Sequence, residues 1–482
     1  MISFRARASA AALGAVLPAF LSALLSALLS ALLSITMAAP AGATDLLGAW
    51  RSALQHDLDY AAAAAAHKAG ESRRGQAAAL WRPSVVFSAA AGRAGSDSSV
   101  SGARFSAPGF GTSDGVAFDT SVNNGSLGRW SVAASLPLYN RERSAQGRQL
   151  ELSADVAELE WRNAQQALML ATAQRYFDVA LAGESLRVLR LQQKAVASAV
   201  AQAQDRFKLG DVPVTDTHEA AARHQAIVAQ VLALETDLQL KQAALADATG
   251  LPTASLAPMF PSNAAMAAEA QSLDAWMQEA NAKNPLLLMQ RAAVEVARQE
   301  AAKSSGAVSP SLDVVAQVGR ERLSGQGDFG AAGNASGNRM IGLQLTVPLY
   351  TGGMRGAREQ EAVHGIAKAQ AQADRAGQQV ALQTRAAWLG LTVGAGRVEA
   401  LAQAVTASRA RLDATRLGRQ VGDRTTLDLL NAENDAAGSE LALLQARVGV
   451  LMDRLKLAAL AGRLDEARLQ SVSDSLQAPG AR

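Results

Sequence analysis

The chain has 482 residues, enough for two to four ordinary domains, and it contains no cysteine. Disulfides, thiolate metal sites, a cysteine nucleophile and a lipid-modified N-terminal cysteine are therefore excluded. The formal net charge is only +3, which argues against a nucleic-acid-binding protein, because such a protein would show a clustered basic excess.

The N-terminus has the pattern of an export signal over residues 1–43. Arg5 and Arg7 form a positive segment, a charge-free apolar stretch follows, and Ala41-Gly42-Ala43 is a small-residue cleavage site. The apolar stretch is longer than usual, so an uncleaved membrane helix is the alternative. We expect cleavage, with a mature N-terminus at or near Thr44.

No later stretch is apolar enough to cross a membrane as a helix. An inner-membrane transporter is therefore excluded. If the mature chain enters a membrane, it must do so as a closed β-barrel, in which every backbone hydrogen bond is satisfied between strands.

The remaining chain follows one plan twice, over residues 44–262 and 263–465, before a polar C-terminal tail at 466–482. Leu136-Pro137-Leu138-Tyr139 returns 211 residues later as Val347-Pro348-Leu349-Tyr350. Gly210-Asp211 returns 212 residues later as Gly422-Asp423. Matches in the same order at several places indicate an internal duplication.

Each repeat begins with a helix and then contains two strands, at about 83–94 and 129–138 in the first and about 310–320 and 340–349 in the second. Apolar and polar residues alternate over about ten positions, as in Trp130–Leu138. This period is typical of a membrane β-strand, apolar toward lipid and polar toward the lumen. An ordinary two-faced sheet in a soluble domain is the alternative.

Two features favour the membrane. Aromatic residues lie within or at the ends of the strands, where an interfacial belt would place them: Trp81, Phe87, Trp130, Tyr139 and Tyr350. The stretches between paired strands, 95–128 and 321–338, are rich in Gly, Ser and Asn. We expect these stretches to be long external loops.

Long helices follow each pair of strands, over 140–250 and 352–462. Residues 140–212 and 352–420 contain no proline, and about 70 helical residues span roughly 100 Å. Such lengths indicate a coiled coil or a tunnel. The last helix carries a heptad seam from Leu427 to Ala458.

Four strands cannot close a barrel alone, because small barrels need about eight. The chain must therefore assemble through its strand edges. A trimer would supply twelve strands and twelve long helical elements, so one symmetry operator would close both layers.

Four segments at 45–60, 171–179, 206–216 and 421–430 resemble, in this order, blocks of the TolC family of outer-membrane export ducts. The resemblance covers about Asp45 to Arg463. It implies a homotrimer with a 12-stranded outer-membrane β-barrel, continued by a long periplasmic α-helical tunnel. It also implies partnership with an inner-membrane ABC or other transporter and a periplasmic adaptor (membrane fusion protein). We expect no cofactor.

In the family, charged side chains at the periplasmic end pinch the tunnel. By position, Asp216 matches a carboxylate of the first helix tip, and Arg424 and Asp428 match an arginine and an aspartate of the second. Asn431 stands where the family often has a second aspartate, and Arg419 where it often has a tyrosine. The carboxylate ring of the gate is therefore expected to be single.

The helix tips themselves are expected to contact the adaptor through Gly210, Asp211, Gly422 and Asp423. Helix capping is the alternative role for the gate residues. Asp216-x-x-Glu219 and Thr425-x-x-Asp428 each fit a capping box. Both roles can hold, since a helix start at the tunnel mouth would also line the mouth.

Enzymatic motifs are missing, so we expect no catalysis. His218-Glu219 is followed by Ala222 where a zinc protease needs its second histidine. Gly352-Gly353-x-x-Gly356 lacks the spacing and acidic partner of a dinucleotide site and is expected to be a tight strand-to-helix junction. There is no Walker motif, so energy must come from a partner.

The sequence therefore predicts a passive outer-membrane export channel, and the alternative is a periplasmic coiled-coil scaffold without a pore. The opening segment resembles the secretion branch of the family, which favours type I protein secretion. Multidrug or small-molecule efflux remains the alternative for the cargo.

Overall fold

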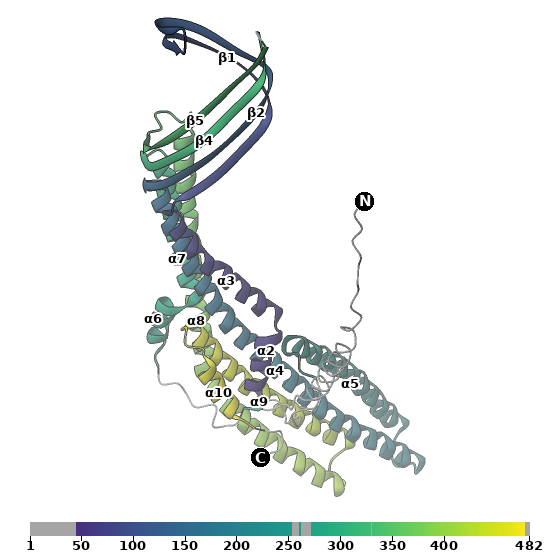
Figure 1. Cartoon of the computed structure of the whole chain (residues 1–482). Helices are drawn as coiled ribbons and strands as arrows, with labels where there is room; N and C mark the ends of the chain where they lie inside the picture. Colours follow the sequence, from purple (N-terminus) through teal and green to yellow (C-terminus); the bar gives the residue numbers. More distant parts are fainter. Residues whose placement is uncertain (1–44, 253–259, 262–270, 329, 478–482) are drawn as a thin grey trace, which may run out of the picture.

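The computed structural model describes residues 45–252, 260–261, 271–328 and 330–477 and shows an elongated molecule (Figure 1). A four-stranded sheet forms one end. Long helices lead from it, through a region with additional short helices, to two helical hairpins at the other end. The expected export signal at 1–43 lies outside the described residues.

The two halves of the chain repeat one series of helices at almost equal lengths. The matching helices, with their residue counts, are α2 (Leu46–His56, 11) and α6 (Leu273–Lys283, 11), α3 (Leu58–Ala79, 22) and α7 (Pro285–Gly306, 22), α4 (Arg141–Lys208, 68) and α8 (Met354–Gln420, 67), and α5 (Val214–Thr249, 36) and α9 (Thr426–Leu460, 35). The short helices join in the same way, because Asp57 and Asn284 each end one helix and cap the next. The expected internal duplication is confirmed.

The helices α4 and α8 are each about 100 Å long at 1.5 Å per residue. Asn140 starts α4 by accepting a 2.9 Å hydrogen bond from the amide of Arg143. Gly352 and Gly353, with φ of 61° and 82°, form the tight junction before α8, where a side chain would strain the backbone. No helix of the described residues has both the length and the apolar character to cross a membrane.

The sheet consists of β1 (Ser84–Ala107), β2 (Gly111–Tyr139), β4 (Ser311–Gly327) and β5 (Gly330–Thr346). The strands are antiparallel in the order β1-β2-β4-β5. Within the described residues, the outer edges of β1 and β5 pair with no other strand. The sheet is therefore open on both sides.

The stretches 95–128 and 321–338 are not the long loops that their composition predicts. They continue the strands: a short turn joins β1 to β2, and β4 and β5 pair as far as Gly327 and Gly330. Pairing with the neighbouring strand satisfies their backbone groups, which outweighs the weak strand preference of Gly and Ser. The fourth strand ends earlier than expected, at Thr346, before Pro348, which has no amide to donate.

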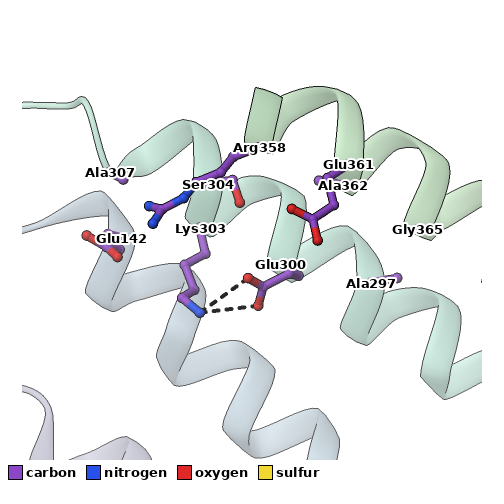
Figure 2. A pocket seen from close by; sticks show the side chains of 10 residues that line it. All are labelled: Glu142, Ala297, Glu300, Lys303, Ser304, Ala307, Arg358, Glu361, Ala362 and Gly365. Carbon is purple, nitrogen blue, oxygen red and sulfur yellow. Dashed lines mark hydrogen bonds and ion pairs between the residues drawn. The ribbon is translucent and has the colours of Figure 1, made fainter. Parts of the chain in front are cut away.

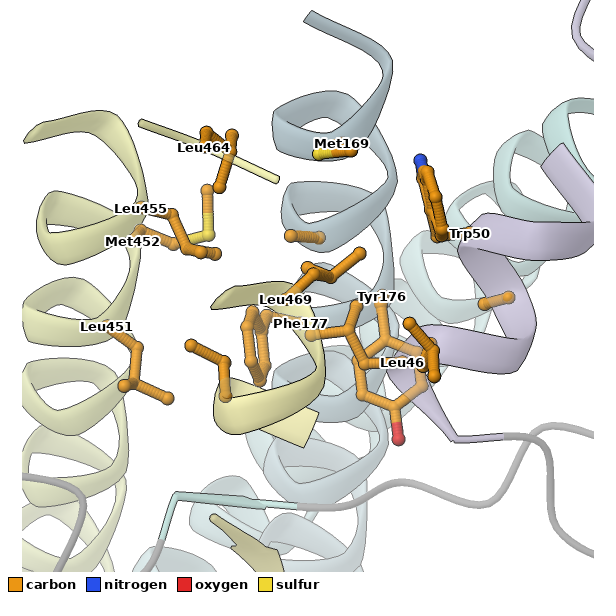
Figure 3. Close-up of a cluster of buried hydrophobic side chains, with 14 of the residues drawn as sticks. Leu46, Trp50, Met169, Tyr176, Phe177, Leu451, Met452, Leu455, Leu464 and Leu469 are labelled. Carbon is orange, nitrogen blue, oxygen red and sulfur yellow. The ribbon is translucent and has the colours of Figure 1, made fainter. Parts of the chain in front are cut away.

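A cluster of buried side chains joins the first and the last helix of the described chain to α4 and α9, midway along the molecule (Figure 1 and Figure 3). It includes Trp50, Phe177, Leu455 and Leu469. Helix α10 (Glu466–Asp474) contributes Leu469, and β6 (Leu476–Gln477) pairs with β3 (Phe260–Pro261). The segment 466–477 is therefore packed structure and not the polar tail that we expected at 466–482, and residues 478–482 lie outside the described residues.

Candidate functional site

The register of the four strands sorts their side chains onto two faces. Side chains directly opposite each other across an antiparallel pair lie on the same face. Successive partners place fourteen residues on one side, here called the apolar face: Val85, Phe87, Ala89, Trp130, Val132, Ala134, Leu136, Leu312, Val314, Ala316, Val318, Ile341, Leu343 and Leu345. In the single chain, Ile341 is 80% exposed and Leu343 is 68% exposed. This surface has the composition of a face turned toward lipid.

The opposite side of the sheet, here called the polar face, carries hydroxyl, amide and charged groups. One row across it runs through Ser88, Ser131 and Asn338, with the hydroxyls of Ser88 and Ser131 3.0 Å apart. Arg129 lies opposite Glu321 in a second row. Such groups suit a water-filled lumen.

The aromatic residues expected at the membrane boundary lie at two levels of the sheet. Trp81, Tyr139 and Tyr350 lie at the end nearest the helices, and Tyr350 is 88% exposed. Trp130 lies on the apolar face farther from the helices, while Phe87 lies within that face.

A polar hollow of about 560 Å³ lies where the strands pass into the helices (Figure 2). Glu142 of α4, Glu300 of α7 and Glu361 of α8 line it together with Lys303 and Arg358. The ammonium of Lys303 lies 3.3 Å from both oxygens of Glu300. Among the described residues, no group of three or more His, Cys, Asp or Glu is arranged to hold a metal ion.

The two helical hairpins end in the same turn. Gly210 after α4 and Gly422 after α8 have φ of 80° and 84°, in the left-handed region that glycine tolerates. The amides of Asp211 and Asp423 each donate to the carbonyl five residues earlier, at 2.9 and 2.8 Å, as in a Schellman motif. All four residues are exposed at the tips, which leaves them accessible to a partner.

Only one of the two expected capping boxes forms. The carboxylate of Asp428 accepts from the amide and the hydroxyl of Thr425, at 3.0 and 2.8 Å, and the Thr425 hydroxyl oxygen accepts from the amide of Asp428 at 3.1 Å. The hydrogen bonds from Thr425, with smaller contributions from Arg424 and Arg411, hold the pKa of Asp428 below its ordinary value. Asp428 is therefore both a cap and a persistent negative charge.

The capping box that we predicted at Asp216 does not form, because α5 begins at Val214, two residues before the expected N-cap. Pro213 occupies the N-cap position, and its side chain makes no capping hydrogen bond. Asp216 lies instead in the first turn of α5, where its negative charge is favourable to the helix dipole. It is exposed and caps nothing.

The remaining gate residues have contacts within the α8–α9 tip or with α4. The side chain of Arg424 folds over Gly418, where an added β-carbon would lie only 2.8 Å from Cγ of Arg424. Arg419 donates a hydrogen bond to the side chain of Gln202 on α4. Asn431 is half-buried on α9.

Asp216 and Arg424 belong to different hairpins, and neither joins an ion pair within the described chain. The described chain therefore contains no ion pair between these two gate residues.

A set of ion pairs that we did not predict from the sequence connects α8 to α9 near the tip. The pairs are Arg409–Glu440 at 2.6 Å, Arg411–Asp435 at 2.8 Å and Arg416–Glu433 at 3.5 Å. Their signal is the reversed order of arginines on α8 and acids on α9, as an antiparallel hairpin requires. The arginines are at least half exposed, so each pair contributes at most about 1 kcal/mol.

Residues 49–251 and 276–463 match the family model described as outer membrane efflux protein, so each half of the chain matches once. The chain belongs to this family. It is therefore an outer-membrane efflux channel, with the sheet in the outer membrane and the long helices in the periplasm.

Similar proteins include outer membrane protein TolC of Escherichia coli, 28% identical over 68% of each chain. The alkaline protease secretion protein AprF of Pseudomonas aeruginosa is 27% identical over 90% of this chain and 87% of its own. Among solved structures, the outer membrane protein VceC of Vibrio cholerae matches with a TM-score of 0.67 at 20% identity. It covers 87% of this chain and 97% of its own, and it supports the fold.

Proposed function

We propose that three copies of this chain form the exit duct of a type I protein secretion system, driven by an inner-membrane ABC transporter and joined to it by a periplasmic adaptor. The observation that carries the assembly is the open sheet. Its two outer edges pair with no described strand, and its apolar face is exposed in the single chain. Three sheets joined edge to edge would satisfy these backbone groups and give twelve strands.

The cargo is inferred from the relatives that align along most of the chain. AprF is named as an alkaline protease secretion protein, and PrtF of Dickeya chrysanthemi, 26% identical over 90% of this chain, as a proteases secretion protein. BepC of Brucella suis, an outer membrane efflux protein, aligns over 64% of this chain. The longer alignments favour protein secretion, and small-molecule efflux is the second candidate.

In this proposal the chain itself forms a passive channel. The polar face of the sheet would line the lumen, and the hairpin tips would meet the adaptor. The charged side chains at these tips serve as a gate in this proposal, and the chemical energy for transport comes from the partner.

Deleting the gene and comparing the proteins of the culture medium with the drug sensitivity of the cells tests the cargo. We expect one or a few proteins to disappear from the medium, to return when the parent gene is restored, and drug sensitivity to stay unchanged. Unchanged secreted proteins with increased drug sensitivity would reject type I secretion in favour of efflux.

A further inference from the structure

The apolar face of the sheet ends in arginines on the side away from the helices. On β1, the row that contains Val85 and Phe87 ends at Arg93. On β4, the apolar row passes from Val318 to Arg320. Arg322 of β4 and Arg339 of β5 occupy neighbouring levels, and the four arginines are here called the arginine belt.

Strand register places the whole belt on the lipid side. Arg339 lies opposite Val318, and Arg320 lies opposite Trp130, both members of the apolar face. Arg322 lies opposite Gly128, two residues from Trp130 along β2 and therefore on the same side. Arg93 follows Phe87 by six residues on β1, an even spacing that also keeps it on this side.

Nothing on this side of the membrane segments neutralises the belt. Over 85–93, 128–138, 312–322 and 337–345, the acids are Asp313 and Glu321, and both alternate onto the polar face. The four arginines are exposed, and none of them joins an ion pair with a described residue. In the proposed trimer, β5 and β1 of adjacent copies meet, and neither lipid-facing row brings a carboxylate to the other.

The belt lies at the depth where lipid headgroups begin. Leu312 to Arg320 is a run of nine residues, and a tilted strand needs about 9–11 residues to cross the hydrocarbon layer. The helices lie in the periplasm and join the strands at the Leu312 end, so the belt lies at the outer leaflet. Arg339, one level deeper, can extend its side chain outward to the same boundary.

We propose that the arginine belt binds the phosphate groups of phosphorylated lipids in the outer leaflet. A guanidinium presents paired N–H donors that match phosphate oxygens, and it keeps its charge at every physiological pH. Four such groups per chain, without a carboxylate on the same face of the membrane segments, favour an anionic headgroup over a zwitterionic one. Binding of this kind requires only that the sheet lies in the outer membrane, so it is independent of whether the channel exports proteins or small molecules.

Binding of lipid A to the purified, detergent-solubilised protein tests the proposal, with lipid A stripped of its phosphates as the comparison lipid. The variant is R320Q/R322Q, and the matched control is R129Q, which removes an arginine next to Trp130 on the polar face. Affinity is measured by native mass spectrometry, and assembly and single-channel conductance are measured on the same preparations.

We expect the parent to prefer lipid A over the stripped lipid. Each arginine near an anionic lipid surface raises the binding affinity by a factor of about five. The double variant should therefore bind lipid A about 25-fold more weakly than the parent. R129Q should stay within about twofold of the parent.

Equal binding by parent and double variant, or equal binding of both lipids, would overturn the proposal. Full competition by millimolar inorganic phosphate would assign the belt to free phosphate instead. If R320Q/R322Q fails to assemble, R93Q and R339Q are measured singly, and each should lose about fivefold. A protein that binds lipid A as expected but is monomeric and conducts no ions would contradict the proposed duct, and not the belt.

Discussion

Asp428 has two roles at the α8–α9 tip, because its carboxylate caps α9 and also carries a charge toward the expected mouth of the tunnel. We expect D428A to weaken cation selectivity and block by multivalent cations, since a ring of carboxylates favours cations. Reversal potentials in planar bilayers measure this. The lowered pKa keeps the carboxylate ionised below the ordinary aspartate pKa, so selectivity should persist as the pH falls toward that value.

N431D is the matched control, because it adds a second carboxylate one turn along the same helix, without touching the cap. It should strengthen cation selectivity. If both variants conduct with the ion preference of the parent, Asp428 is a cap and the constriction lies elsewhere.

Arg424 and Asp216 make no ion pair within one copy, so any latch between them must join neighbouring copies. We expect R424A and D216A each to raise single-channel conductance in bilayers without loss of the trimer. An exposed pair contributes only about 0–1 kcal/mol, which an adaptor could overcome. The double variant should conduct like either single variant if the two residues act together. Additive increases would contradict a shared contact.

The contact between α8 and α9 contains a carboxylate in an unfavourable place. Burial raises the pKa of Asp453, and Lys456, 3.6 Å away, only partly offsets this. Because the pKa of Asp453 is higher in the folded than in the unfolded state, the ionised carboxylate destabilises the fold at any pH above the folded-state pKa. This destabilisation disappears once the pH falls below the unfolded-state pKa. We therefore expect D453N to raise the thermal unfolding temperature at neutral pH.

The advantage of D453N over the parent should shrink as the pH is lowered, because the parent then becomes neutral at this position too. D413N, on an exposed aspartate of α8 beside Arg416, is the control and should give no such pH-dependent gain. An advantage of D453N that is constant across pH would show that charge burial is not its cause.

Local patterns predicted the elements well where one segment carries the whole signal. Leu444, Leu451 and Leu455 lie on the expected heptad seam of α9, and all three are buried. The strand extensions beyond the membrane were missed, because Ser- and Gly-rich segments favour loops unless a neighbouring strand pairs with them. Helix α10 was missed because its few apolar positions carry no signal by themselves, and they are buried only in a cluster that α2, α4 and α9 build together.

At the candidate gate, too, a contact between residues close in sequence was predicted, and a contact between distant residues was not. The Thr425–Asp428 box was predicted because its residues are three positions apart. The Arg419–Gln202 contact joins residues 217 positions apart, and no local pattern contains it. The Pro213 cap of α5 was missed because an aspartate three residues before a glutamate fits a cap equally well.

The assembled protein should be a trimer near three times the mature mass after detergent extraction. The physical reason is the sheet with two unpaired edges and too few strands to close alone. Light scattering with detergent correction measures the mass, and a stable monomer with a closed barrel would contradict the assembly.

I341R places a charge near the middle of the apolar face and should reduce outer-membrane trimer strongly, since arginine there costs about 2–4 kcal/mol per copy. M340R, one residue away on the polar face, is the control and should assemble normally. Equal assembly of both variants would argue against lipid on the Ile341 side.

The two β-hairpins of the sheet differ in length. The strands β1 and β2 of the first hairpin have 24 and 29 residues, whereas β4 and β5 of the second have 17 residues each. Crossing the membrane uses about ten residues of each strand. The surplus of β1 and β2 therefore extends outside the cell, beyond the shifts in strand register near Val122, whose buried side chain lies beside Gly125 and Gly325. Antibodies, bacteriophages and proteases would meet this projection first, so immune and viral selection should act on residues 96–121 far more than on the duct beneath them.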